Sequence, residues 1–278
     1  MNKSIKLLSS ILLIIGSLFF VGCSLVDNTM IKLGFRNSDF EYIKENKVDK
    51  IIIQSARDSG FRFVVTDTNA INDIYEILSK GDEKDEKTSL DPDYIFEVHI
   101  GEDVKSYKYV VSVDERGVGN FYDDNKAYEI SKSLDDTILQ NLSFIRKPRE
   151  FRNIYYNSIL DVLKVKKDEL TSSEHKVGID ITGDVDCLKY MFSVDLKEFE
   201  KDVNKIIPNA QLIKNNADEF DTIISVKNRG YNSKLFKTTI VVDDKKDKIY
   251  ETYYVDGIYE YKDWTITVSE PNKRPDKW

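Results

Sequence analysis

The stretch FRFVVTDTNAINDIYEIL, residues 61–78, contains a strand signal and a helix signal in direct succession. Phe61–Thr66 is rich in β-branched and aromatic residues, which predicts a strand. Asp67 or Thr68 can cap the start of a helix. The apolar residues that follow recur at helical spacing, at Ile71, Ile74, Tyr75 and Leu78. A strand followed at once by an amphipathic helix predicts a protein of the α+β class.

Further strand signals flank this stretch on both sides. Ile51–Gln54 precedes it, with a turn at Ser59-Gly60 between the two strands. Three more strands are predicted after the helix, at Tyr94–Ile100, Tyr107–Val113 and Gly119–Tyr122. Residues 49–126 therefore predict a module of β-β-α-β-β-β order, in which an antiparallel sheet carries one packed helix.

The second half of the chain predicts the same order. Strands are expected at Val177–Ile181, Tyr190–Val194, Thr222–Lys227, Phe236–Val242 and Lys248–Val255, with a helix capped by Asp195 after the second of them. Asp67 and Asp195 are 128 residues apart, and the same offset separates Val98 from Val226. We interpret the equal offsets as a duplication. Two unrelated α+β segments with similar element lengths are the alternative.

These patterns divide the chain into five segments. They are a leader at 1–22, a tether at 23–48, the first module at 49–126, a helical connector at 127–172 and the second module at 173–278. The connector is predicted from two runs of apolar residues at helical spacing, which are separated at Arg146-Lys147-Pro148.

The N-terminus has the features of an export signal. Lys3 and Lys6 precede the apolar run Leu7–Val21, which is short for a membrane-spanning helix. The segment Phe20-Val21-Gly22-Cys23 that ends the run resembles the lipobox of bacterial lipoproteins. The resemblance implies that Cys23 carries diacylglycerol and anchors the protein to the extracytoplasmic face of the cell membrane. A plain secretory peptide or an uncleaved signal anchor is the alternative.

Composition excludes several classes of function. The net charge is −8, so the chain repels phosphate backbones and no nucleic-acid partner is expected. Two cysteines and two histidines rule out a disulfide framework, a four-cysteine zinc site and a three-histidine metal site. No sequence motif predicts a cofactor, a metal or a catalytic residue. The abundance of Lys, Ile, Asn, Asp and Tyr is typical of an AT-rich genome, such as that of a Gram-positive bacterium.

The first module resembles a known family. The features that carry the likeness are Phe61–Asp67, the helix with Ile71 and Leu78, and Pro92-Asp93-Tyr94. The unit at Lys50–Ser131 is similar in these features to uncharacterised Gram-positive lipoproteins of the YhfM type. The resemblance implies an antiparallel sheet with one packed helix, and it implies no activity.

Two groups of polar residues are candidates for chemistry. Glu97 and His99 share one face of a predicted strand, where they can form an acid–base pair or lie on a solvated surface. Asp184, Asp186 and Cys187 cluster in a loop, either as part of a cation site or as a turn with exposed acids and a core cysteine.

Aromatic residues are dense near the C-terminus. Those proposed to form a binding surface for a protein, peptide or glycan of the cell envelope are Tyr253, Tyr259, Tyr261 and Trp264. Ordinary packing between strands is the alternative explanation.

Three functions are consistent with these observations. The sequence favours a non-enzymatic binding or accessory protein of the cell envelope. An envelope hydrolase that uses Glu97 and His99, and a purely structural spacer, are the alternatives.

Overall fold

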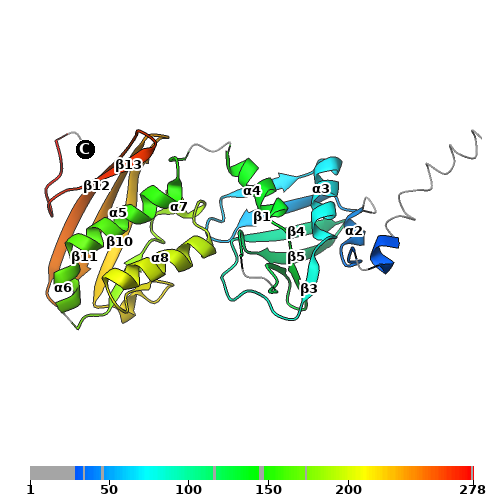
Figure 1. Cartoon of the computed structure of the whole chain (residues 1–278), viewed down its shortest axis with the longest axis horizontal. Coiled ribbons are helices and arrows are strands. Elements are labelled where there is room, and N and C mark those ends of the chain that lie inside the picture. Colours follow the sequence, from blue (N-terminus) through cyan, green and yellow to red (C-terminus); the bar gives the residue numbers. More distant parts are fainter. Residues whose placement is uncertain are drawn as a thin grey trace, which may run out of the picture.

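A computed structural model describes residues 29–33, 35–44, 47–114, 117–143, 147–172, 174–276 and 278. The predicted leader and Cys23 lie outside these residues. Figure 1 shows two modules that follow one another along the long axis of the molecule, each with its own sheet and helices. The α+β class is therefore confirmed. Among the described residues, no helix is both long enough and apolar enough to cross a bilayer.

The first module contains α2 (Glu41–Lys44), β1 (Lys50–Ser55), β2 (Arg62–Val65), α3 (Thr68–Leu78), β3 (Asp82–Lys84), β4 (Tyr94–Ile100), β5 (Asp103–Tyr109), β6 (Phe121–Tyr122), β7 (Ala127–Glu129) and α4 (Ser133–Ser143). The second module contains α5 (Phe151–Val165), α6 (Lys167–Ser172), β8 (Val177–Asp180), α7 (Val185–Leu188), α8 (Ser193–Ile206), β9 (Gln211–Leu212), a 3-10 turn (Ala217–Glu219), β10 (Thr222–Tyr231), β11 (Leu235–Asp244), β12 (Ile249–Glu260) and β13 (Asp263–Val268).

The first sheet has the strand order β2-β1-β4-β5-β6-β7-β3, and its neighbouring strands pair antiparallel. Residues alternate between its two faces, so that Ile53 and Phe96, which pair directly, both lie in the core. Helix α3 begins where the sequence predicts, because the Asp67 side chain accepts a hydrogen bond from the backbone N–H of Ala70 at 3.0 Å. The predicted module gains the short strands β3 and β7.

Part of the predicted tether belongs to the first module. Phe40 is fully buried, with its ring 4.8 Å from that of Tyr128. Asn37 donates hydrogen bonds to the backbone oxygens of Leu78 and Gly81, at 3.1 and 2.7 Å. The prediction of a tether is thus wrong for residues 35–44, because the apolar side chains in this mixed segment cover the end of the first core.

The predicted helical connector is divided between the modules. β7 joins the first sheet, and Leu134 and Ile138 of α4 lie in the first core. Helix α5 is the central helix of the second module and packs across its sheet. A Cβ at Gly257 on β12 would lie only 2.4 Å from Cδ1 of Ile154 on α5, which explains the glycine there. The connector residues are therefore core elements, because their apolar faces require a sheet to cover them.

The second sheet differs from the prediction. Its strand order is β13-β12-β11-β10-β8-β9, and β8 pairs parallel with both β10 and β9. The strand expected at Tyr190–Val194 does not form, because Phe192 is the N-cap residue of α8. Asp195 lies in the first turn of that helix and is not its cap.

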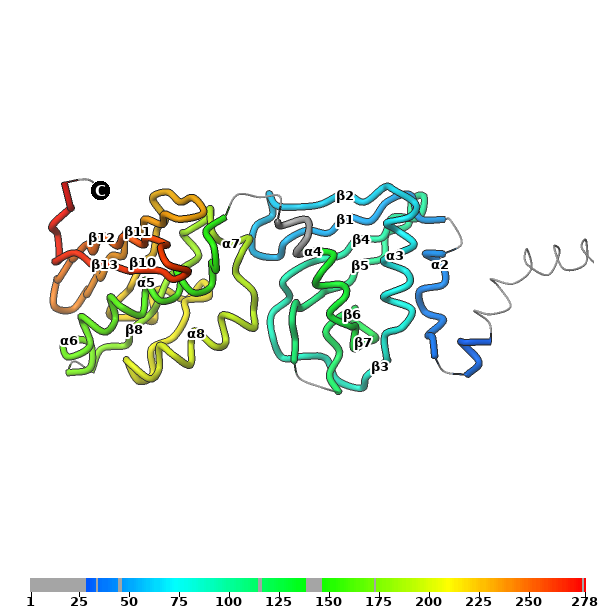
Figure 2. Tube along the Cα trace, turned by 45° about the horizontal axis from the view of Figure 1, so that its top comes forward, coloured from blue at the N-terminus to red at the C-terminus, as the bar shows by residue number. Residues whose placement is uncertain are grey.

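The predicted antiparallel repeat is accordingly wrong for the second module. β10 returns parallel to β8 after helix α8, whereas β4 returns antiparallel to β1 after α3. Elements that lie at the same sequence offset in the two modules therefore pair differently in the two sheets. In both modules the helices cover one face of the sheet, and Figures 1 and 2 show the long helices on a common side.

A buried polar network joins the two modules. Nη1 of Arg57 donates to Oδ1 of Asp93 at 2.6 Å and to the backbone oxygen of Met191 at 3.2 Å. The backbone N–H of Ser193 donates to the same Asp93 oxygen at 2.8 Å, and Arg57 also contacts the Ser193 hydroxyl. Phe192 packs against the first core. The start of α8 is thereby fixed on the first module.

Candidate functional site

The four aromatic residues predicted to form a binding surface do not lie on one surface. Tyr253 and Trp264 are buried in the second core, and the Trp264 indole donates to the backbone oxygen of Arg149 at 2.9 Å. Tyr259 is half-buried and packs against Trp264, with their ring centroids 5.3 Å apart. Tyr261 is 99% exposed at the β12–β13 turn. Tyr253 and Trp264 are therefore core residues and not part of a binding surface, because they point toward helix α5 and not toward solvent.

Glu97 and His99 are neighbours, as their spacing on one strand predicts. Oε2 of Glu97 lies 3.5 Å from Nε2 of His99, on the face of the first sheet opposite the helices. The pair makes a long contact on a partly exposed strand face. Its geometry is consistent with either of the two sequence interpretations.

The cluster of Asp184, Asp186 and Cys187 lies in the short helix α7 and at its N-cap, Asp184, and not in the predicted loop. Asp184 accepts a hydrogen bond from the backbone N–H of Asn228 at 3.0 Å, and burial raises the pKa of its carboxyl group. Asp186 is exposed. Cys187 is fully buried, and burial raises the pKa of its thiol far above the usual range, which disfavours the nucleophilic thiolate.

A groove on the open face of the second sheet combines cationic and aromatic side chains. We call it the basic groove. It has a volume of about 540 Å³ and is lined by Arg229, Lys237, Thr239, Val241, Tyr250, Thr252, Tyr254, Arg274 and Trp278. The strand residues in this set alternate with core residues, so they face away from α5 and α8.

The aromatic part of the basic groove is built around Trp278. Its ring meets that of Tyr254 edge to face, at 4.8 Å between centroids. Nζ of Lys237 and Cζ of Arg274 each lie 5.7 Å from the Trp278 ring, within range for cation–π attraction. Arg274 also donates to the backbone oxygen of Trp278 at 3.1 Å.

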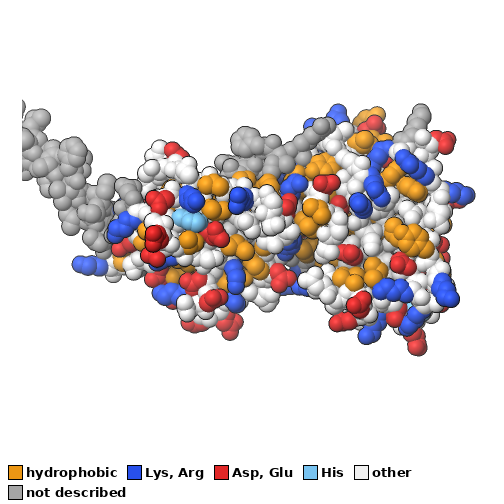
Figure 3. Space-filling view, turned by 180° about the vertical axis from the view of Figure 1, so that it is seen from behind, with side chains coloured by type: hydrophobic (Ala, Val, Ile, Leu, Met, Phe, Trp, Pro, Cys, Tyr) orange, Lys and Arg blue, Asp and Glu red, His pale blue; other side chains and the backbone are white. Residues whose placement is uncertain are grey.

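The charge of the basic groove is positive, in a protein that is negative overall. No carboxylate side chain lines it, and Lys237 pairs with Asp256 beside it at 3.5 Å. Arg229 donates from Nε to Oγ1 of Thr239 at 3.0 Å, and no described carboxylate lies within ion-pair distance of its guanidinium. Figure 3, seen from the side opposite Figure 1, shows hydrophobic and Lys or Arg side chains interspersed on the second module.

Sequence reasoning missed this groove, although one signal was available. Tyr250, Thr252 and Tyr254 share one strand face, and Glu251 and Tyr253 share the other. Strand parity therefore separates Tyr253 from Tyr254. Parity alone does not say which of the two faces the helix covers.

A second cavity, of about 470 Å³, lies near the start of α5. Phe151, Tyr190 and Phe192 give it an apolar wall. Its Arg152 is paired with Asp195 at 3.3 Å and also contacts Glu198. Because Arg152 already has acidic partners within the protein, it is less available to bind a charged ligand than the cations of the basic groove are.

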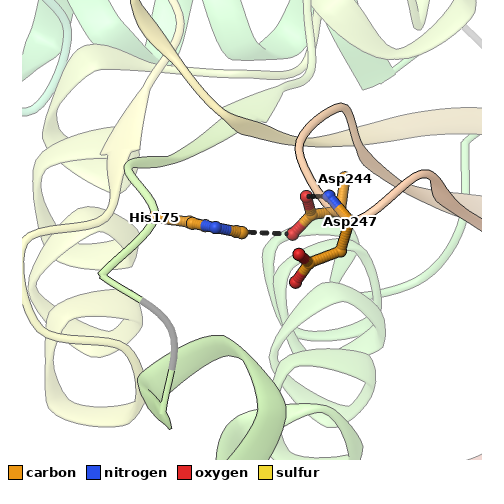
Figure 4. Close-up of side chains that lie close together, drawn as sticks. All are labelled: His175, Asp244 and Asp247. Carbon is orange, nitrogen blue, oxygen red and sulfur yellow. Dashed lines mark hydrogen bonds and ion pairs between the residues drawn. The ribbon is translucent and has the colours of Figure 1, made fainter.

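His175, Asp244 and Asp247 form the one group of potential metal ligands found among the described residues (Figure 4). Nδ1 of His175 lies 2.8 Å from Oδ2 of Asp244, which also accepts from Oγ1 of Thr222 at 2.8 Å. Burial acts to raise the pKa of Asp244. Hydrogen bonds from the backbone of Asp247 and from His175 and Thr222 outweigh this and lower the pKa to about 2.

Comparison with known proteins finds a family match for the first module. The family described as YhfM protein matches residues 44–148, and the match ends where the chain passes from the first module to helix α5. No curated protein and no solved structure matches the chain. The basic groove and the His175 cluster both lie outside the matched residues. Over residues 44–148 the first module is thus similar to the YhfM family.

Proposed function

We propose that this protein is a lipid-anchored, extracytoplasmic binding protein that captures an acidic glycan in the basic groove. The anchoring half of the proposal rests on the lipobox-like segment that ends at Cys23. The single observation that carries the binding half is Arg229. Its guanidinium is positioned by Thr239 beside aromatic rings and has no described acidic partner.

The chemistry of the basic groove matches this ligand class. Arginine forms two parallel hydrogen bonds with a carboxylate or phosphate group, and hydrogen bonds to charged groups contribute about 1.5–3 kcal/mol each. The apolar faces of sugar rings pack against aromatic rings, which Tyr250, Tyr254 and Trp278 provide. A neutral glycan would contact only the aromatic rings of the groove, and a small acidic ion would contact only its arginine and lysine side chains. An acidic sugar polymer uses both.

The test measures binding of the full chain, purified in mild detergent, by the change in tryptophan fluorescence. Polygalacturonate and a phosphodiester-linked glycan serve as acidic probes, and dextran as the neutral probe. We expect saturable binding of at least one acidic probe, which weakens with added salt because the charges lie at the surface. The double variant Arg229→Ala/Arg274→Ala should bind at least about tenfold more weakly.

The matched control is Arg62→Ala, which removes an exposed arginine from the first module and should leave affinity unchanged. Equal binding of dextran, or equal loss in the control, would refute the acidic-glycan proposal. A single-stranded oligonucleotide that binds more tightly than either acidic glycan would also contradict it. Anchoring is tested separately, by the loss of incorporated palmitate in Cys23→Ser.

A further inference from the structure

We propose that His175, Asp244 and Asp247 bind a divalent transition-metal ion such as Zn²⁺. This site is separate from the basic groove and does not depend on the proposed function. One imidazole nitrogen and two carboxylate oxygens are a donor set suited to Zn²⁺ or Mn²⁺, and poorer for Ca²⁺, which prefers six to eight oxygens.

The three side chains are already close enough to share an ion. One ligand atom from each lies within 4.8 Å of the others. Ligands bonded to zinc at about 2.0–2.2 Å lie up to about 4 Å from each other across the ion. A small rotation of the exposed Asp247 side chain therefore completes the set. Three protein ligands leave further positions open for water.

The local charges favour a cation at this position. Lys245 and Lys246 lie between the two acids in sequence, but their side chains are directed elsewhere. Nζ of Lys245 donates to the backbone oxygens of Ala217 and Phe220, and Lys246 pairs with Asp221 at 3.0 Å. No described Lys or Arg forms an ion pair with Asp244 or Asp247. Two carboxylates that lie close together, with no lysine paired to either, attract a divalent ion.

Two of the ligands are held in place before any ion arrives. Oδ1 of Asp244 accepts from the backbone N–H groups of Lys246 and Asp247, at 3.0 and 2.9 Å. Thr222 holds the other oxygen, and the His175 side chain is only 12% exposed. Binding through Nδ1 requires that its proton move to Nε2 or to solvent, and the metal then takes the place of that proton.

The ion would tie together two segments that are distant in sequence. His175 lies just before β8, Asp244 is the last residue of β11, and Asp247 lies in the turn that follows it. An ion shared by these segments would close one end of the second sheet. Binding should therefore raise the thermal stability of the second module, because a ligand that binds only the folded state stabilises it.

The experiment uses the full chain in detergent, with its affinity tag removed and with bound metal stripped by EDTA. Titration calorimetry with Zn²⁺, Mn²⁺ and Ca²⁺ should show one Zn²⁺ per chain and weaker Ca²⁺ binding. Asp247→Asn should weaken Zn²⁺ binding at least about tenfold. This variant keeps the backbone N–H that Asp244 accepts, so the fold is preserved.

Two controls separate this site from adventitious binding. Asp243→Asn removes the neighbouring acid on the opposite strand face, and His99→Asn removes the histidine of the first module. Both should retain wild-type affinity and the wild-type shift in melting temperature on adding Zn²⁺. The proposal is overturned if wild type binds no Zn²⁺, or if Asp247→Asn binds it as wild type does. If His99→Asn lost more Zn²⁺ affinity than Asp247→Asn does, the proposal would also be overturned, because the ion would then bind at Glu97 and His99.

Discussion

Lys166 is a buried lysine whose charge is compensated by acids from two different elements. Its side chain is 5% exposed at the C-terminal end of α5. Nζ lies 3.0 Å from Oε2 of Glu251 on β12 and also contacts Glu169 on α6. Burial acts to raise the pKa of Glu251, but hydrogen bonds from Lys166 and Tyr253 outweigh it and lower the pKa.

Replacing this lysine should destabilise the protein and change its response to acid. Lys166→Met keeps the apolar stem but leaves Glu251 without its cation, so the free energy of unfolding at pH 7 should fall by about 1–3 kcal/mol. In wild type, the stability from Glu251 is present above its ordinary pKa of 4.5 and is lost as pH falls through the lowered folded-state value.

Denaturant unfolding at pH 7 and at pH 3 measures both effects. The difference between wild type and Lys166→Met should be smaller at pH 3, because the contribution of ionised Glu251 is lost as the pH falls below its ordinary pKa of 4.5. An undiminished difference at pH 3 would mean that packing, and not charge, accounts for the loss.

At the scale of an element, helix α3 depends on the cap that the sequence predicts. Asp67→Ala removes the hydrogen bond to the Ala70 N–H and should lower the free energy of unfolding by about 1 kcal/mol. Asp73→Ala is the matched control, because Asp73 is exposed within the same helix and alanine is a better helix former. Thermal unfolding followed by circular dichroism should therefore separate the two variants. Equal melting temperatures would show that the cap contributes nothing.

At the scale of the whole molecule, we expect Arg57 to couple the unfolding of the two modules, because it contacts residues of both. Arg57→Ala leaves the Asp93 carboxylate buried without its cation, which typically costs about 3–5 kcal/mol. Because Asp93 lies in the first sheet region, that module should unfold at lower denaturant. Both tryptophans, Trp264 and Trp278, belong to the second module, so tryptophan fluorescence reports that module alone.

The unfolding transitions followed by circular dichroism and by tryptophan fluorescence should coincide in wild type and separate in Arg57→Ala. Circular dichroism, which follows both modules, should change before tryptophan fluorescence does in Arg57→Ala. The control Lys214→Ala removes an exposed pair with Asp91 in the same junction and should leave the signals together. Coincident transitions in Arg57→Ala would disprove the coupling.

Local patterns predicted the elements better than they predicted the pairing of strands. The alternation in Tyr94–Ile100 and the capped helix after Asp67 are properties of neighbouring residues, and both appear in the structure. Whether β10 pairs parallel with β8 depends on how α8 crosses the sheet, and no local pattern records this. The same limit explains Phe40, whose burial depends on aromatic partners up to 88 residues away in sequence.

The sequence by itself determined the α+β class, the start of α3, the Glu97–His99 neighbourhood and the resemblance of the first module to the YhfM type. Each of these follows from side-chain periodicity or from a contiguous stretch. Only the tertiary structure decided that α5 covers the face of Tyr253 and leaves that of Tyr254 open. Only the tertiary structure brings His175 to Asp244. Both outcomes depend on contacts between segments far apart in the chain, which form when apolar faces are buried together.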